Sequence, residues 1–382
     1  MKQRILKLID LFKAPDGLDA VAREKRFWRI ATLVITLGMV IAILVCLLTG
    51  RYNCTRLEVF IAFIHGILDR LIWVLELPSM LIGSIDYSIT NPIPVTWGAN
   101  VDTVIWTIRI PRILAAGFIG GGLAISGASY QSLFRNPLVS ESILGVSSGA
   151  SLGACIGILI ASVGALTTTL AFIGGVAAVA CTYTISKFLK GNQTLLLVLA
   201  STVVTSLFSA GISIVKYIAP TDTALPEITF WLMGSFAKVT AKNLVLLIPI
   251  ICVCTFIIFR IRWQMNVLAL GDSEAKTLGI NIRRTRLLII ISSTLITAIS
   301  VCVCGMIGWV GVIIPQITRM LVGPDNRRLV PCAFFSGTIF MLIVDLLCRN
   351  VLVAEIPIGI VTSLIGAPIF VMILKRAKEG WL

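Results

Sequence analysis

The sequence contains a run from Ile113 to Phe134 that has no charged residue and is long enough to cross a lipid bilayer. This run holds five glycines, Gly117, Gly120, Gly121, Gly122 and Gly127. A helix that faces lipid gains nothing from so many glycines. A helix packed among other helices does gain, because small residues let two backbones approach closely. We therefore expect this segment to be a membrane helix enclosed by other helices.

The composition extends this conclusion to the whole chain of 382 residues. Hydrophobic residues make up 57% of it, charged residues only 13%, and the mean hydropathy is +1.00. A soluble domain carries about 25% charged residues, so we expect an all-α, polytopic membrane protein. The net charge of +14 does not indicate a nucleic-acid partner, because the cations are scattered in short segments between apolar runs instead of gathering on one face.

Ten apolar segments are expected to span the membrane: 27–48, 110–134, 143–163, 166–188, 194–218, 243–259, 287–304, 307–322, 330–348 and 357–374. Cytoplasmic segments of membrane proteins carry an excess of Lys and Arg. With both termini in the cytoplasm, 23 of the 32 Lys and Arg residues fall inside and 9 outside. The charge pattern therefore agrees with an even number of spans and two cytoplasmic termini.

The spans divide the chain into five parts. Residues 1–26 are expected to form a cytoplasmic amphipathic segment on the membrane surface, before the first transmembrane helix, 27–48. Residues 49–107 form an extracytoplasmic insertion, in which charges interrupt the apolar stretch 57–85 and make an additional span unfavourable. The remaining parts are a core of about nine transmembrane helices at 108–376, which includes a basic loop at 262–286, and a cytoplasmic tail at 377–382.

A polar break with the sequence FRNPLVSES interrupts the apolar runs after the glycine-rich helix. The Asn136-Pro137 pair should end that helix, since proline removes a backbone donor and disfavours helical angles in the residue before it. Ser140 or Ser142 can cap the next helix, with Glu141 near its positive end. The alternative is an ordinary turn between two spans.

The segment 109–150 and three further segments resemble the FecCD-type permeases. These are the membrane subunits of ATP-driven importers for iron–siderophore complexes, haem, cobalamin and related metal chelates. The further segments are MNVLALGDSEAKTLGI at 265–280, GMIGWVGVIIPQITR at 305–319 and EIPIGIVTSLIGAPIF at 355–370. The resemblance covers roughly residues 92–376 and implies the fold of a type II ABC importer permease.

The resemblance implies a docking site for an extracytoplasmic substrate-binding protein at three arginines, Arg109, Arg112 and Arg349. All three lie at the expected outer ends of spans, where a positive charge runs against the inside excess. In the family, arginines at these positions face acidic residues of the binding protein. The alternative is that they are interfacial cations whose side chains extend to the membrane surface.

The basic loop resembles the coupling helices that bind in a cleft of the ATPase subunit, and its residues that match the family motif are Gly271, Glu274, Ala275, Leu278 and Gly279. Asp272 or Ser273 can cap a short helix there, and Gly279 can end it, although a plain turn is the alternative. The chain has no G-x-x-x-x-G-K-[ST] loop for nucleotide phosphates. The permease itself is therefore expected not to be an enzyme, and ATP is expected to bind to a partner subunit.

The resemblance places a cytoplasmic gate at the turn after the glycine-rich helix, with residues Asn136 and Leu138. The turn before span five, with Gln193 and Thr194, is placed to be its neighbour and is assigned to the same gate. The chain departs from the family pattern at Gln316, where histidine is usual, and at Met306, where proline is usual. Glutamine can still form hydrogen bonds but does not titrate near neutral pH, so we assign Gln316 no protonation role. Glu355 is expected to be structural, as an acidic residue at the start of the last span.

The sequence thus predicts the permease subunit of an ABC importer in the cytoplasmic membrane of a prokaryote. Its expected partners are two ATPase subunits, a substrate-binding protein, a second permease chain (in a homodimer or a heterodimer) and membrane lipid. The expected cargo is an iron–siderophore complex or a similar chelate, with cobalamin, haem or molybdate as alternatives. We expect a largely apolar pathway, because spans five and ten carry almost no charge away from their ends.

Three alternatives to this interpretation are a metal site, a membrane enzyme and an ion-coupled secondary transporter. His65 is the only histidine, and the C-x-C pairs at 252–254 and 302–304 point in different directions on a helix, so no metal site or cofactor is expected. A membrane enzyme would need a cluster of catalytic groups that the sequence does not contain. An ion-coupled secondary transporter would usually need buried carboxylates, and Asp345 is the only acidic residue well inside a late span.

Overall fold

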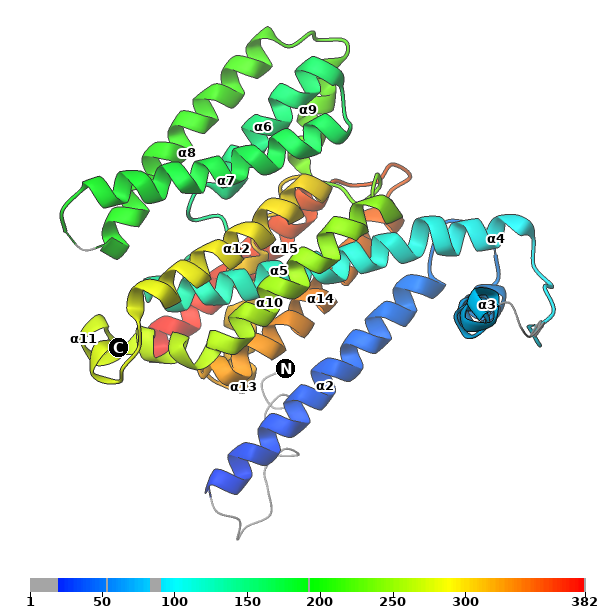
Figure 1. Ribbon diagram of the computed structural model, residues 1–382, viewed down its shortest axis with the longest axis horizontal. Helices are drawn as coiled ribbons and strands as arrows, with labels where there is room; N and C mark the ends of the chain where they lie inside the picture. Colours follow the sequence, from blue (N-terminus) through cyan, green and yellow to red (C-terminus); the bar gives the residue numbers. More distant parts are fainter. Residues whose placement is uncertain (1–19, 53, 83–90, 192, 381–382) are drawn as a thin grey trace.

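The computed structural model describes residues 20–52, 54–82, 91–191 and 193–380, and within these residues it contains helices and no strand. The expected amphipathic segment at the N-terminus lies mostly outside the described residues. The helices, shown in Figure 1, are α2 Ala20–Leu48, α3 Arg56–Ile82, α4 Ala99–Thr103, η1 Val104–Arg109, α5 Ile110–Phe134, α6 Val146–Ala161, α7 Ala165–Phe188, α8 Gln193–Ile218, α9 Ala224–Met233, α10 Ala241–Leu270, α11 Asp272–Thr277, α12 Ile282–Cys304, α13 Val310–Val322, α14 Asn326–Asn350 and α15 Ile358–Gly380.

The ten expected spans correspond to ten apolar helices. Seven are long and apolar enough to cross a membrane: α2, α5 (continuous with α4 and η1), α7, α8, α10, α12 and α14. The other three are shorter apolar helices, namely α6, α13 and the Ile358–Ile373 part of α15. The all-helical membrane fold predicted from hydropathy is therefore confirmed. The charged, interrupted helix α3 is not among these candidate spans, and Figure 1 shows it beside α4, away from the main bundle.

The helix boundaries differ from the expected ones in the polar segments. Helix α10 continues to Leu270, past the expected end at residue 259, and α15 continues through the expected tail to Gly380. The outer segment 219–242 contains α9. Charged side chains mark where a helix leaves the apolar layer, but the backbone remains helical until a residue such as Gly271 interrupts it.

Helix α5 forms the centre of the bundle, and every one of its residues is buried except Ile110, Leu114 and Phe118. Figure 1 shows α5 passing between α10, α12 and α14, with α6, α7 and α8 in a separate layer beyond α12. A methyl group on Gly120 would lie 2.3 Å from the carbonyl oxygen of Gly337 in α14. The prediction that glycines make this helix a tightly packed one is therefore confirmed.

Candidate functional site

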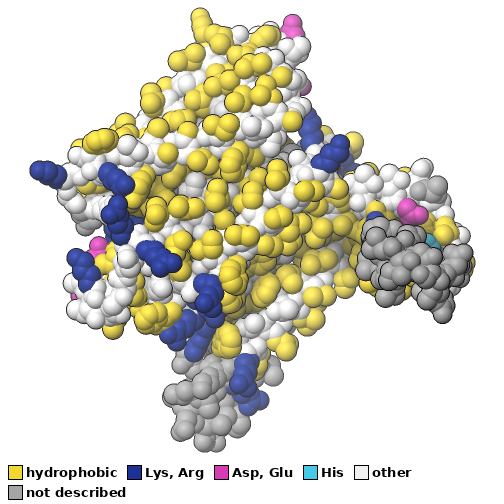
Figure 2. Space-filling view, viewed as in Figure 1, with side chains coloured by type: hydrophobic (Ala, Val, Ile, Leu, Met, Phe, Trp, Pro, Cys, Tyr) yellow, Lys and Arg dark blue, Asp and Glu magenta, His cyan; other side chains and the backbone are white. Residues whose placement is uncertain are grey.

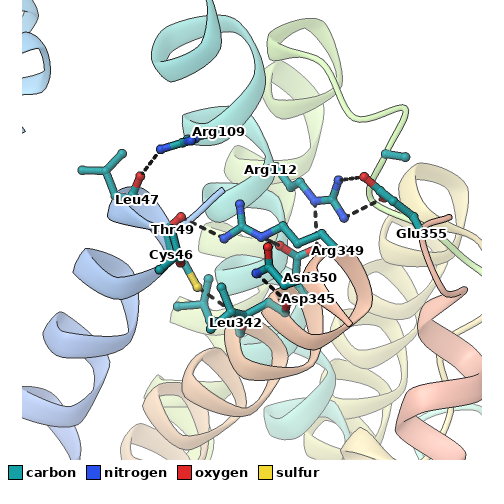
Figure 3. Close-up of polar contacts among 12 residues, drawn as sticks. Cys46, Leu47, Thr49, Arg109, Arg112, Leu342, Asp345, Arg349, Asn350 and Glu355 are labelled. Atoms are coloured by element: carbon teal, nitrogen blue, oxygen red, sulfur yellow. Dashed lines mark hydrogen bonds and ion pairs between the residues drawn. The ribbon is translucent and has the colours of Figure 1, made fainter. Parts of the chain in front are cut away.

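Three arginines lie together at one end of the bundle, which we call the arginine end (Figure 3). Arg109 is the last residue of η1, Arg112 lies in the first turn of α5, and Arg349 lies in the last turn of α14. Their exposed fractions are 4%, 6% and 7%. The structure thus brings the three predicted docking residues together, with their side chains buried among neighbouring helices.

Arg112 is the centre of a network of ion pairs. Its Nε donates a hydrogen bond of 2.8 Å to Oδ1 of Asp345, and its two terminal nitrogens each lie 2.9 Å from an oxygen of Glu355. The Nε of Arg349 lies 3.6 Å from the other carboxylate oxygen of Asp345, Oδ2. Such two-pronged contacts with a carboxylate give directional as well as electrostatic stabilisation. The network joins α5, α14 and the segment that precedes α15.

This network corrects the expected position of Glu355 and defines the partners of Asp345. Glu355 does not cap the last helix, because α15 begins three residues later, at Ile358, and the carboxylate turns to Arg112. Its role is still structural. Asp345 is fully buried but is paired with two cations, so it is not the free carboxylate that ion coupling would need.

Two of the arginines also bind the end of α2. Arg109 donates to the carbonyl oxygen of Leu47 at 2.7 Å, and Arg349 donates to that of Cys46 at 2.8 Å (Figure 3). The last carbonyl groups of a helix lack partners within the helix and carry partial negative charge, which favours cations there. The arginine end is therefore a charged joint that fastens α2 to the bundle.

At the opposite end of the bundle, α11 is a short helix set between α10 and α12. It begins after Gly271 and is followed by Gly279, whose φ of +72° is favourable for glycine and ends the helix as expected. Ala275 is fully buried, whereas Leu278 is 55% exposed and Glu274 is also exposed. The two predicted coupling residues with large side chains thus face outward.

The expected capping of α11 by Asp272 or Ser273 is wrong. Gly271 occupies the N-cap position, so Asp272 becomes the first helical residue and its carboxylate is available for other partners. The Ser273 hydroxyl instead donates to Oε2 of Glu274 at 2.9 Å. Hydrogen bonds from its own backbone N–H and from Ser273 lower the pKa of Glu274, which remains charged at neutral pH.

The turn after α5 contains the predicted gate residues Asn136 and Leu138, and both are exposed. The side-chain oxygen of Asn136 accepts a hydrogen bond from the Leu138 N–H at 2.9 Å, which is an Asx-turn. Capping of the next helix by a serine is corrected by the structure. Gly145 is the N-cap of α6, and the hydroxyls of Ser140 and Ser142 lie 3.1 Å from each other.

Two glutamine side chains fasten this turn to α13. Gln316 donates to the Pro137 carbonyl oxygen at 2.7 Å, and Gln131 donates to the carbonyl oxygens of Val139 and Gly311 at 3.4 and 3.2 Å. Arg319 in turn donates to both glutamine side chains, at 3.1 Å each. Gln316, which departs from the family pattern, thus has a definite structural role that uses hydrogen bonds and no titration.

Glu141, which we expected near the positive end of the next helix, lies in the same turn and is only 1% exposed. Its Oε2 has no hydrogen-bond partner among the described residues and lies against Gly311 of α13, where an added methyl group would be 2.1 Å away. Burial raises the pKa of Glu141 to about 7. Sequence reasoning missed this buried acid because a charged residue in a polar turn is normally solvated.

The second gate segment meets the first through charged side chains near α11. Gln193 and Thr194 are the first residues of α8. The Gln193 side-chain oxygen accepts a hydrogen bond from Arg286 at 2.8 Å, and Asp272 pairs with both Arg286 and Arg135. The sequence predicted only a capping role for Asp272 and no specific role for the two arginines.

The chain is similar in sequence to a family of known transport proteins. The FecCD transport family model matches residues 71–376. Over 279 residues the chain is 40% identical to the molybdate import system permease protein MolB of Haemophilus influenzae, covering 72% of this chain and 82% of that protein. It is 34% identical over 328 residues to the hemin transport system permease protein HmuU of Yersinia pestis, covering 82% and 96%.

A solved structure described as an inward-facing conformation of a putative metal-chelate type ABC transporter is also similar. It has a TM-score of 0.74 and 34% sequence identity, and the match covers 90% of this chain and 98% of that chain. The likeness therefore extends over the bundle as well as over the four sequence segments.

Proposed function

Because the chain belongs to the FecCD transport family, whose members are permeases of ABC importers, we propose that it works with two ATPase subunits, a second permease chain and an extracytoplasmic binding protein. ATP binds to the ATPase subunits, and the permease provides the pathway. Closure of the ATPases moves α11, and the gate segments of the two permease chains open and close in response.

The observation that carries this proposal is the construction of α11. The helix is fastened to the bundle by buried Ala275, while exposed Glu274 and Leu278 present a charge and an apolar group side by side. A small exposed helix of this kind, set firmly on two long helices, can dock in a cleft of a partner and pass on its movement. An isolated turn would yield locally and transmit little.

The charge distribution supports a cytoplasmic position for α11 and for both termini. Figure 2 shows many of the visible Lys and Arg side chains around the α11 end, beside a broad hydrophobic surface. The positive-inside tendency then places this end in the cytoplasm and the arginine end outside. Cations in this region are Arg260, Arg262, Lys276, Arg283, Arg284 and Arg286.

The arginine end is the proposed docking surface for the binding protein. Arg109, Arg112 and Arg349 outnumber the carboxylates of Asp345 and Glu355 by three to two, so the cluster keeps a net positive charge. A net positive cluster attracts acidic side chains and orients an approaching partner. Because the guanidinium groups are already paired within the chain, docking would use their residual charge more than free donors.

The proposed cargo is a metal chelate delivered by the binding protein. Helix α8 has no charged residue from Gln193 to Val215, and α15 has none from Ile358 to Leu374. A pathway beside such uncharged helices suits a large complex better than a bare cation, because a bare cation would need carboxylate or soft ligands along its path. The 40% identity to a molybdate permease makes an oxyanion the second candidate. Uptake of labelled ferric siderophore, haem, cobalamin and molybdate into vesicles separates these cargoes.

Purification of the tagged chain in mild detergent tests the proposal. We expect a P-loop ATPase to co-purify, to hydrolyse ATP in a vanadate-sensitive manner, and to be lost from the double variant Glu274→Ala, Leu278→Ala. Arg56→Ala is the matched control, because Arg56 is exposed and lies outside the bundle end that carries α11. Uptake that survives ATP depletion but not collapse of the ion gradient would favour the ion-coupled alternative instead.

A further inference from the structure

One carboxylate connects α11 to both segments of the proposed gate. Asp272, the first residue of α11, accepts hydrogen bonds from Arg135 at 2.9 Å and from Arg286 at 3.2 Å. Arg135 directly precedes Asn136, so the first of these contacts ties α11 to the turn after α5. Arg135 also donates to the carbonyl oxygen of Leu268 at 3.1 Å, which holds the end of α10 in the same cluster.

Arg286 extends the connection to α8. One terminal nitrogen contacts Asp272 and the other donates to the side-chain oxygen of Gln193 at 2.8 Å. Arg286 is 7% exposed, so its guanidinium is shielded from water, although the Asp272 side chain is 52% exposed. A planar guanidinium presents several donors in fixed directions and can hold two partners at once. We call Arg135, Asp272, Arg286 and Gln193 the Asp272 bridge.

The backbone at Arg135 supports a specific role for its side chain. Arg135 ends α5 with a φ of +51°, in the left-handed region that side chains rarely adopt. Glycine or asparagine would fill this position with less strain. The strained position directs the arginine side chain toward α10 and α11, where both of its partners lie.

Beside the Asp272 bridge lies a cavity of about 520 Å³. It is lined by Gln193, Asp272 and Arg286 together with Lys187, Lys276 and Arg283, among others. The cavity leaves space between the start of α8 and α11, so these segments are joined chiefly by polar side chains at this point. A movement of one can therefore reach the other through the bridge without displacing a packed core.

We propose that Asp272 and Arg286 are positioning residues that transmit the movement of α11 to the start of α8, while Arg135 transmits it to the turn after α5. This inference rests on the proposed function, in which the ATPase moves α11. When α11 shifts, Arg286 follows Asp272, because separation would leave a buried guanidinium without its carboxylate. The pair of Arg135 with Asp272 is about half exposed and therefore couples the turn after α5 less strongly. The two gate segments then move together, under the control of one coupling helix.

The test measures gate movement without needing the cargo. A cysteine replaces Leu195, which is exposed in the first turn of α8, the gate segment that Arg286 reaches, in a background where the exposed Cys181 and Cys252 are changed to serine. Its labelling rate by a membrane-impermeant maleimide is measured in the reconstituted complex, without nucleotide and with ATP plus vanadate. We expect the nucleotide-dependent change in rate to fall about tenfold in Arg286→Gln and in Asp272→Asn, the size of a typical allosteric coupling.

A matched control and a double variant make the result specific. Arg283→Gln removes the same charge from an exposed position on the same helix, where the guanidinium has no hydrogen bond or ion pair with any described residue, and it should label like the parent protein. Arg286→Lys keeps the charge but cannot hold both partners, so a folded Arg286→Lys protein should also lose coupling. The double variant Asp272→Asn, Arg286→Gln should be no worse than either single variant if the bridge acts as a unit.

Three outcomes are distinguishable. Parent-like gate movement in a folded Arg286→Gln protein would overturn the bridge while leaving the proposed function intact. Loss of the ATPase from Arg286→Gln on purification, as expected for the Glu274 and Leu278 double variant, would make Arg286 a docking residue and overturn its role in transmission. Failure of the parent chain itself to bind an ATPase would overturn the proposed function.

Discussion

The side-chain amide of Gln316 in α13 donates a hydrogen bond of 2.7 Å to the carbonyl oxygen of Pro137 in the turn after α5. These residues are 179 positions apart in the chain. The contact fixes the turn that carries Asn136 and Leu138 against the short helix α13. It therefore sets the resting position of the proposed gate.

Removal of this contact should loosen the turn. We expect Gln316→Ala to lower the free energy of unfolding by about 1 kcal/mol, the usual net contribution of one hydrogen bond. We also expect faster hydrogen exchange of the backbone amides at residues 138–145, which mass spectrometry can measure. Gln316→His keeps a side-chain donor and is the matched control. Equal exchange in Gln316→Ala and the parent protein would show that the turn is held by its other contacts.

The close approach of Gly311 to Glu141 predicts a specific steric conflict. A methyl group on Gly311 would lie 2.1 Å from Oε2 of Glu141 and 3.0 Å from the Leu123 carbonyl oxygen. Gly311→Ala should therefore destabilise the protein by about 1–3 kcal/mol, as overpacking of a core does. The melting temperature in detergent measures this. Glu141→Ala should restore part of the loss in the double variant, and no rescue would place the conflict at the backbone contact alone.

Glu141 also predicts a pH dependence of stability. Its pKa of about 7 in the folded protein lies above the ordinary value of 4.5, so the folded state holds this proton more firmly than the unfolded state. The stabilisation from the neutral acid is complete below the ordinary value and is lost as the pH rises through about 7. Compared with Glu141→Gln, the parent protein should lose melting temperature between about pH 5 and pH 8. Parallel pH profiles for the two proteins would contradict the buried titration.

The arginine end predicts unequal effects of removing its partners. Arg112→Ala leaves Asp345 fully buried with only the longer contact to Arg349, and breaking a buried pair costs about 3–5 kcal/mol. Glu355→Ala removes a carboxylate that is 35% exposed and should cost less, because the Arg112 guanidinium keeps its contact with Asp345. Melting temperatures of the two variants compare these effects. A larger loss in Glu355→Ala would mean that Asp345 is satisfied without Arg112.

The positions of the membrane helices follow from the sequence because of a simple physical rule. A backbone in lipid must satisfy its own polar groups, so a long apolar segment becomes a helix wherever it lies in the chain. Even the burial of α5 could be predicted, since the glycines that permit close packing, such as Gly120 against Gly337, have no use on a lipid-facing surface. The four segments that resemble the FecCD family added the expected positions of the arginine cluster, α11 and the gate turn.

The partners of the polar side chains required the tertiary structure. Asp272 looked like a helix cap because capping is a local pattern, but a glycine occupies the cap and the carboxylate meets Arg135, which is 137 residues away. Glu141 was expected near the positive end of the next helix because of its place in a polar turn, but α13 covers it. Local sequence determines which segments cross the membrane, because the bilayer acts on each segment separately. Only the packing of distant helices decides which charges meet, because those contacts depend on how each helix is turned toward its neighbours.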